Sequence, residues 1–262
     1  ESFFDVGGNS LSAMRLAARA GEVLGVEVSV RDIFEAPSVR ELIAATSGHG
    51  VALAPITRVD PRPELVPLSF AQQRMWFINQ FDTTAATYNI PAVLNLTGDL
   101  DADALRQAVI DVLERHEVLR TVFPARAGVP HQVVGDIADF DSHDVWRVVG
   151  TRDELLASVT DGFDVTTQWP LRVRLLSGGD RDFVLALTVH HIAADGESIL
   201  PLVTDIVTAY TARAQGDSPD WAPLEVQFAD FAIWQHTVLG SADDAESVIG
   251  RQLSYWRSQL AG

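Results

Sequence analysis

Four prolines within residues 48–67 divide the sequence into two parts. This stretch reads GHGVALAPITRVDPRPELVP and has no sustained hydrophobic periodicity. Proline fixes φ and biases the residue before it away from helix, so a helix does not continue through such a segment. We therefore predict a semi-extended linker over residues 48–67, between one domain at residues 1–47 and a second at residues 68–262.

Residues 1–47 have the pattern of a small helical bundle. After the turn at residues 5–8, apolar side chains recur at roughly helical spacing: Leu11, Met14, Ala18 and Val23. Ser38 is placed to cap a last helix whose inward side chains would be Val39, Leu42 and Ile43. Short helices in so few residues form a marginal core, and we infer that the N-terminal part of this unit lies before residue 1.

Residues 68–262 mix helical and strand patterns. Residues 101–117 carry an amphipathic helical stripe formed by Leu105, Val109, Val112, Leu113 and His116. In residues 171–176, apolar side chains alternate with Arg172 and Arg174, as in a strand. Residues 183–188 form an unbroken apolar run, typical of a strand buried on both faces, and residues 199–216 are helical again in pattern. The fold class that we predict is α+β.

Two adjacent histidines end the buried strand, in the stretch VHHIAADG at residues 189–196. Successive side chains of a strand point to opposite faces, so His190 and His191 cannot face the same cavity. We expect one of them to serve chemistry and the other to serve packing. Asp195 and Gly196 precede the next helix, where aspartate is a favoured cap, so the capping interpretation makes Asp195 architectural.

Composition excludes several classes of function. The formal charge is −17, from 36 acidic residues against 19 basic ones, and such a surface repels nucleic acid. The chain has no cysteine, so any thiol chemistry must use sulfur from outside it. No metal site is expected, because the two histidines point apart and no HxH or HExxH spacing occurs. The apolar runs are too short to span a bilayer and ESFFDVGG is no secretory signal, which predicts a cytoplasmic protein without a membrane partner.

The stretch FFDVGGNSL at residues 3–11 resembles the attachment site of carrier proteins from nonribosomal peptide synthetases. The resemblance covers residues 1–47 and implies that Ser10 receives a 4′-phosphopantetheine arm as cofactor. Independently, Gly7 and Gly8 permit a tight turn, and Ser10 lies where a helix begins, a favourable place for a phosphodiester. The alternative is that Ser10 is only an N-cap after a glycine turn.

Four motifs of the second domain resemble, in the family's order, those of the condensation domain of the same synthetases. They are LSFAQQRMWF at 68–77, RHEVLRTVF at 115–123, VHHIAADGES at 189–198 and FADFAIW at 228–234. The resemblance implies the N-terminal lobe of that domain, with a chloramphenicol-acetyltransferase-like mixed sheet covered by helices. Glu197 departs from the tryptophan often found at its position, which puts local packing or donor recognition in doubt.

The resemblance also assigns roles to the residues of the third motif. His191 would face the reaction channel, while His190 and Asp195 would build the turn. Asp195 would pair with an arginine, for which Arg120 is the preferred partner and Arg115 the alternative. Two roles stay open for His191: it removes the proton from an attacking amine as the bond forms, or it holds the amine and stabilises the charged intermediate.

The implied reaction joins an acyl or peptidyl thioester to the amine of a tethered aminoacyl group, forming an amide. The implied partners are an upstream adenylation domain, a downstream carrier protein, the second condensation lobe and a phosphopantetheinyl transferase. We expect this chain alone to be modified at Ser10 but not to condense. Within the fold, an epimerisation domain is the alternative, although carriers before epimerases often read GGDS rather than GGNS. A non-catalytic docking module is the alternative from another class.

Overall fold

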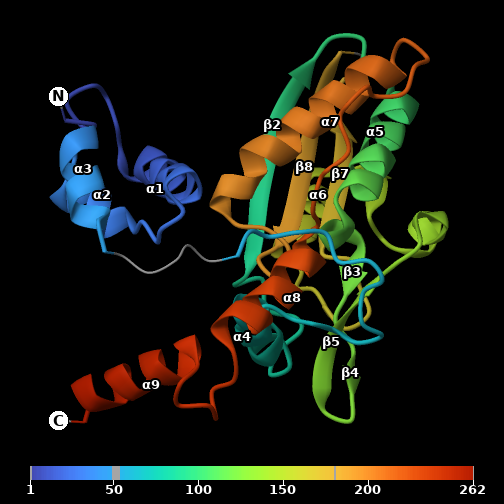
Figure 1. Ribbon diagram of the computed structural model, residues 1–262. Coiled ribbons are helices and arrows are strands. Elements are labelled where there is room, and N and C mark those ends of the chain that lie inside the picture. Colours follow the sequence, from blue (N-terminus) through green and yellow to red (C-terminus); the bar gives the residue numbers. More distant parts are fainter. Residues whose placement is uncertain (1, 49–53, 180, 262) are drawn as a thin grey trace. The chain divides into compact units, whose positions relative to one another are not determined.

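The computed structural model describes residues 2–48, 54–179 and 181–261 (Figure 1). The chain divides into two compact units, residues 1–55 and residues 56–262. None of the helices in these described ranges is long and apolar enough to cross a membrane.

Unit 1 consists of three short helices, each of which begins with a capping box. The helices are α1 (Ser10–Leu24), α2 (Val30–Glu35) and α3 (Val39–Thr46). Their N-caps are Asn9, Ser29 and Ser38, and each cap exchanges hydrogen bonds with the third residue of its helix. These exchanges satisfy N–H groups that the first turn of a helix otherwise leaves without a partner.

The face of α1 that packs inward is not the predicted one. Its buried residues are Ala13, Ala17 and Gly21, whereas Met14 is 51% exposed and Val23 is 72% exposed. Of the apolar side chains predicted to face inward from α3, only Leu42 is buried. The backbone of α1 lies close to the segment that follows it, since a Cβ at Gly21 would lie 3.1 Å from the carbonyl oxygen of Val26. Large side chains do not fit between these two segments. Side-chain size therefore decides which face packs.

Unit 2 is built on a four-stranded sheet in the order β2-β8-β7-β6. The strands are β2 (Asn89–Thr97), β6 (Trp146–Val149), β7 (Leu171–Ser177) and β8 (Asp182–His190). All pairs are antiparallel except β6 with β7, which is parallel. Helices α5 (Ala102–Arg115) and α7 (Ile199–Arg213) lie together on one face, and α6 (Arg152–Thr160) covers the other (Figure 1).

The main core lies between the sheet and the pair α5 and α7. The strands contribute Leu171, Val173, Leu175, Leu185, Leu187 and Val189. Helix α5 contributes four of the residues predicted from its stripe, namely Leu105, Val109, Val112 and Leu113. The alternate residues of β7 and β8 face α6, where Ala186 packs against Leu155. Strand β8 is thus buried on both faces, as its unbroken apolar run predicts.

Arg172 and Arg174 are not on a solvated face, contrary to what apolar and polar alternation in β7 indicates. Arg172 is 8% exposed and Arg174 is 3% exposed. Both lie on the α6 side of the sheet, and both donate to backbone carbonyls of neighbouring segments. Each arginine can be buried because its guanidinium carries several N–H donors and hydrogen-bonds to more than one carbonyl.

A second, smaller sheet contains β1 (Val66–Pro67), β3 (Thr121–Val122), β4 (Ala125–Arg126) and β5 (Val129–Val134). The second motif, at residues 115–123, contains a 3₁₀ turn at Glu117–Arg120 that leads into β3. The remaining helices of unit 2 are α4 (Phe70–Asn79), α8 (Phe228–Leu239) and α9 (Val248–Gln259), with 3₁₀ turns at Ile137–Ser142 and Gly196–Ser198.

The second half of the predicted linker contacts unit 2. Arg62 lies 3.0 Å from a carboxylate oxygen of Asp230 and 2.6 Å from one of Glu117. Val66 and Pro67 pair with β5. Prolines keep this segment out of a helix, but ion pairs and strand pairing hold it in place, so the boundary between the units falls at residues 55 and 56.

Replacing Leu187 by alanine should destabilise unit 2 by about 2–5 kcal/mol, because it leaves a cavity in a side-chain core without solvent access. The measurement is urea unfolding followed by tryptophan fluorescence. Val93→Ala is the matched control on the same sheet: Val93 is 54% exposed, and its loss should cost less than about 1 kcal/mol. Equal losses for the two variants would contradict the proposed position of the core.

Candidate functional site

The backbone at the end of β8 fixes the two histidines on opposite sides. The N–H of His190 donates to the carbonyl of Pro170, on the β7 side, at 3.0 Å. The N–H of His191 donates to the carbonyl of Tyr88, on the β2 side, at 2.8 Å. Since consecutive residues are held by opposite neighbours, their side chains leave the strand in opposite directions.

His190 is the packing member of the pair. It is 1% exposed, and its ring meets the ring of Phe163 edge to face at 5.9 Å. Its Nδ1 accepts a hydrogen bond from the N–H of Ile192 at 3.1 Å, so the ring proton resides on Nε2. Burial lowers the pKa of His190 to about 4, with smaller contributions from His191 and Arg172. A neutral imidazole is therefore part of the fold at this position.

His191 is exposed and lies with its ring edge to face with Tyr88, at 6.5 Å between centroids. Within the described ranges, its ring nitrogens make no hydrogen bond. An exposed imidazole without intramolecular partners can donate to or accept from an external group. The structure thus separates a buried, hydrogen-bonded ring from an exposed one, on the opposite faces that strand geometry predicts.

Asp195 caps the 3₁₀ turn at Gly196–Ser198, as the capping interpretation predicts. Its Oδ1 accepts from the Ser198 hydroxyl at 2.6 Å and from the Ser198 N–H at 3.0 Å. The hydrogen bond from the hydroxyl is the main reason why the pKa of Asp195 lies below its usual value, and His191 contributes to this lowering. Asp195 is therefore within electrostatic reach of His191.

The predicted ion pair of Asp195 with Arg120 or Arg115 is wrong. Arg120 donates through Nε to the carbonyl of Leu113 at 2.9 Å and also to the carbonyl of Gly135. Arg115 lies 3.1 Å from Asp205 and donates to the carbonyl of Ala222 at 2.7 Å. Neither arginine pairs with Asp195 within the part of the chain that the structure describes. Arg120 instead joins α5 to the segment at Gly135, and Arg115 joins α5 to α7 and to residue 222.

Gly196 leaves space beside the turn that follows His191. A Cβ at this position would meet no heavy atom within 4 Å, counted over the described residues, and its φ lies outside the left-handed region. Neither backbone strain nor packing within these residues therefore requires glycine here. The backbone of the turn stays open to an approaching group.

Gln72 is a site residue that sequence analysis missed. It is 2% exposed, accepts from the N–H of Ser69 at 3.0 Å and donates to the carbonyl of Ile192 at 3.3 Å. Helix α4 thereby holds the loop after the histidine pair. The pattern serine-x-x-glutamine at residues 69–72 is a capping-box signature, and it was the available signal for a fixed glutamine.

Asp230, in the fourth motif, holds the segment before β1. Its side chain has no exposed surface, and it accepts from Arg62 at 3.0 Å, from the N–H of Gln227 at 2.8 Å and from the N–H of Val59 at 3.3 Å. Burial alone would raise the pKa of Asp230, but hydrogen bonds from Arg62 and the two backbone groups lower it. The motif thus fixes local structure around the entry to unit 2.

Ser10 is the first residue of α1 and is exposed. The alternative that it is an N-cap is wrong, because Asn9 caps the helix and accepts from the N–H of Ser12 at 3.0 Å. The preceding turn needs both glycines: Gly7 has φ 96°, and a Cβ at Gly8 would lie 2.4 Å from a ring carbon of Phe3. An exposed hydroxyl on a fixed turn at a helix N-terminus fits a covalently attached phosphodiester.

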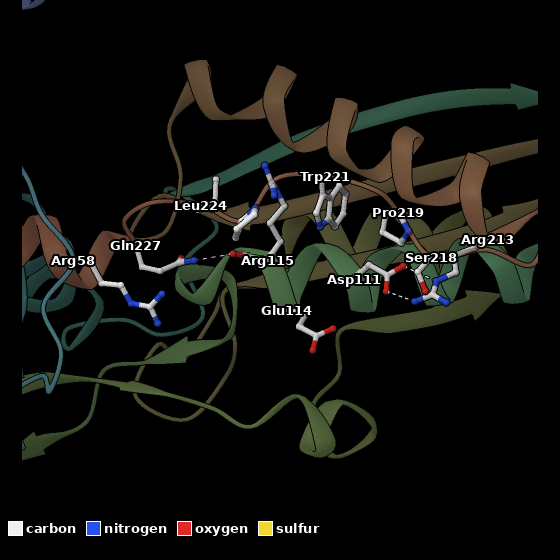
Figure 2. Close-up of a pocket in the computed structure, with 11 residues that line it drawn as sticks. Arg58, Asp111, Glu114, Arg115, Arg213, Ser218, Pro219, Trp221, Leu224 and Gln227 are labelled. Atoms are coloured by element: carbon white, nitrogen blue, oxygen red, sulfur yellow. Dashed lines mark hydrogen bonds and ion pairs between the residues drawn. The ribbon is translucent and has the colours of Figure 1, made fainter.

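A pocket of about 480 Å³ lies away from the histidine pair, between α5, α7 and residues 218–227 (Figure 2). Figure 2 shows Arg213 paired with Asp111, and the guanidinium of Arg115 stacks on Trp221 at 4.8 Å. Its lining is mostly charged and polar, and both of these arginines are engaged by neighbouring residues. The two histidines are not among the residues that line it.

Comparison with known proteins identifies the family. Residues 63–262 match the family model of the condensation domain, and residues 1–46 match that of the phosphopantetheine attachment site. The chain therefore belongs to the condensation domain family, preceded by the attachment site for 4′-phosphopantetheine. The predicted fold class is confirmed: the mixed sheet covered by helices is the chloramphenicol-acetyltransferase-like fold of this family.

The relatives are nonribosomal peptide synthetases. A probable non-canonical nonribosomal peptide synthetase, CymA, of Salinispora arenicola is 47% identical over 100% of this chain. A dimodular nonribosomal peptide synthase of Bacillus subtilis is 42% identical over 99% of it. The chain spans only 3% and 11% of the lengths of these two proteins.

Solved structures agree with the fold. The X-domain from teicoplanin biosynthesis, in a complex with OxyB, is 36% identical and matches with a TM-score of 0.70. The match covers 80% of this chain and 46% of the X-domain chain. The starter condensation domain of the rhizomide synthetase RzmA is 18% identical and matches with a TM-score of 0.60. The match covers 76% of this chain and 48% of the RzmA domain chain. At that identity the likeness concerns the fold alone.

The depressed pKa of His190 should make stability depend on pH. Between pH 6.5 and about 4, the unfolded chain binds a proton at this residue while the folded chain does not, so the free energy of unfolding should fall with falling pH. The loss is at most about 3 kcal/mol. Urea unfolding across this window measures it.

His190→Asn removes the titrating ring but keeps an acceptor for the N–H of Ile192, and it should abolish this part of the slope. His191→Asn is the matched control at the exposed neighbour and should retain the slope. An unchanged slope in His190→Asn would show that the buried imidazole is not the group responsible.

Proposed function

We propose that this chain carries the His191 side of an amide-forming site in a nonribosomal peptide synthetase. The observation that carries the proposal is the exposed imidazole of His191, without intramolecular partners among the described residues, beside the buried neutral ring of His190. The amine of one tethered aminoacyl group attacks the carbonyl carbon of a tethered acyl thioester. The C–N bond forms, the C–S bond breaks, and the proton lost by the amine ends on the departing sulfur.

His191 can serve this reaction in two ways. An α-amino group has a pKa of about 7.7 to 8, so part of it is already deprotonated near neutral pH. His191 can take the proton as the bond forms, or it can hydrogen-bond the amine in place and stabilise the developing charge. Either role typically contributes about 10²- to 10⁴-fold to the rate. The open turn at Gly196 gives the reacting groups room beside it.

Ser10 is the residue that we assign to hold the 4′-phosphopantetheine arm. When bound, this group supplies a thiol on a flexible chain, which the protein lacks because it has no cysteine. The hydroxyl of Ser10 is exposed, and the first turn of α1 presents N–H groups and the positive end of the helix dipole to a phosphodiester. Asn9 and Ser12 form the cap and leave the Ser10 hydroxyl for modification.

The partners follow from the same role. A phosphopantetheinyl transferase modifies Ser10, an upstream adenylation domain supplies the acyl group, and a downstream carrier protein presents the amine. A second condensation lobe completes the channel around His191. We place the protein in the cytoplasm. The relatives named above support peptide synthesis and do not favour the alternatives, an epimerisation domain or a non-catalytic docking module.

Incubation with coenzyme A and a phosphopantetheinyl transferase should add one 4′-phosphopantetheine to the chain, as measured by intact-mass spectrometry. Ser10→Ala should abolish the adduct because it removes the only acceptor oxygen that we assign. Ser12→Ala is the matched control, since it removes a hydroxyl in the same turn and should leave loading intact. An adduct that persists in Ser10→Ala would place the attachment elsewhere.

In the full-length synthetase, His191→Ala should lower the rate of amide formation by about 10²- to 10⁴-fold without changing the urea midpoint. The measurement is peptide formation between two loaded carriers. Val207→Ala, an exposed position on α7, is the control and should be near wild type. Unchanged condensation in His191→Ala would favour the docking module, and an inverted Cα in the product with no new amide would favour epimerisation.

A further inference from the structure

Arg172 carries a buried positive charge that no carboxylate neutralises directly. It is 8% exposed, donates to the carbonyl of Asp161 at 2.8 Å and also donates to the carbonyl of Gly162. Over the described ranges, no carboxylate lies within ion-pair distance of it. A buried charge is costly unless it is well hydrogen-bonded, so its retention in the central sheet calls for a cause.

One line of contacts runs from Arg172 to the histidine pair. The guanidinium stacks on the ring of Phe163, 3.7 Å from its centroid, and Phe163 is fully buried. The ring of Phe163 meets His190 edge to face. His190 in turn accepts the N–H of Ile192, the residue after His191. Each contact fixes the orientation of the next ring or loop.

A second line runs through the backbone that Arg172 holds. Asn89, directly opposite His190 in the sheet, donates to the carbonyls of Val159 and Asp161. Gly162 lies so close to the next segment that a Cβ would be 2.3 Å from the carbonyl oxygen of Thr83. The turn segment at residues 84–88, just before β2, supplies the carbonyl of Tyr88, which accepts the N–H of His191.

We propose that Arg172 is a positioning residue for His191. Its guanidinium holds the ring of Phe163 and the backbone at residues 161–162, and these hold the strand end from which His191 projects. Arg172 pairs with Thr188 in the sheet, on the same face as His190, so it lies on the opposite side from His191 and does not touch the reacting groups. The catalytic consequence rests on the proposed function of His191, whereas the positioning itself does not.

Charge adds to this geometry. Protonation of Nδ1 of His190 would remove the acceptor for the N–H of Ile192. The charged or titratable groups around His190 are Arg172 from β7, His191 from the following turn and Tyr88 from the residues before β2. The positive charge of Arg172 disfavours the imidazolium, so it protects the hydrogen bond that shapes the loop.

Arg174 offers a matched control. It lies two residues along the same strand, on the same face, and is 3% exposed. It also donates to backbone carbonyls, those of Asp144 and Val145, and pairs with the carboxylate of Asp144 at 2.6 Å. Loss of either arginine removes a buried guanidinium and its hydrogen bonds to backbone carbonyls. Of the two, among the described residues, Arg172 alone stacks on Phe163 and is connected through it to the histidine pair.

The test uses NMR on the 262-residue chain. In Arg172→Met, the pKa of His190 should rise from about 4, and the amide of Ile192 should exchange at least about tenfold faster relative to the most protected core amides. In Arg174→Met, both readouts should match the wild type although stability falls to a similar extent. If Arg172→Met does not fold, Phe163→Leu breaks the ring contacts and should give the faster exchange at Ile192 without the rise in the pKa of His190, because the charge of Arg172 remains.

In the full-length synthetase, Arg172→Met should lower kcat by roughly 10- to 100-fold with KM unchanged, the scale of a small misplacement of a reacting group. Arg172→Lys, which keeps the charge, should recover part of the loss, and Arg174→Met should be near wild type. A wild-type exchange rate of Ile192 in both Arg172→Met and Phe163→Leu would overturn the positioning role. Full activity of His191→Ala would contradict the proposed function. The NMR measurements would still test the role of Arg172 in that case.

Discussion

The hydrogen bond from the N–H of Ile192 to Nδ1 of His190 is the contact on which the site depends. Strand β8 is buried on both faces and ends at His190, so the N–H of Ile192 has no partner in the sheet. The side chain of His190, the last residue of the strand, accepts this N–H. The chain turns, Ile192 enters a small core with Leu68 and Phe163, and His191 is left on the outside. Because the acceptor must be an unprotonated nitrogen, burial of His190 and the nearby charge of Arg172 are part of the same arrangement.

Hydrogen bonds between buried or partly buried polar groups connect the four motifs of unit 2. Gln72 of the first motif reaches the carbonyl of Ile192 in the third, 120 residues away, and Trp76 donates to the carbonyl of Phe123 in the second. Gln227, next to the fourth motif, both accepts from and donates to the backbone at residues 115–117. Leaving one of these groups unpaired costs more free energy than its hydrogen bond contributes, so the network constrains the sequence for structural reasons.

Sequence reasoning succeeded where one local period decides the outcome. The strand β8, the inward stripe of α5 and the opposite directions of His190 and His191 follow from periods of 2 and 3.6 residues, and the cap at Asp195 follows from local turn chemistry. It failed where the partner of a side chain lies in another segment of the chain. The partners of Arg120 and Arg172 are carbonyls of separate segments, which alternation of apolar and polar residues does not reveal. In α1, close approach of the backbones selects alanine and glycine over larger apolar residues.

The two adjacent imidazoles end in opposite electrostatic surroundings, and this follows from the strand. On the buried side, burial and, to a smaller extent, the charges of His191 and Arg172 make positive charge on His190 unfavourable, which keeps that ring a hydrogen-bond acceptor. On the exposed side, the carboxylate of Asp195 is close enough to interact with His191, and it is itself fixed by Ser198. Positive charge that develops at His191 is attracted by this carboxylate, whereas the same charge one residue earlier is repelled. A single change of face therefore buries one ring in the fold and leaves the other exposed.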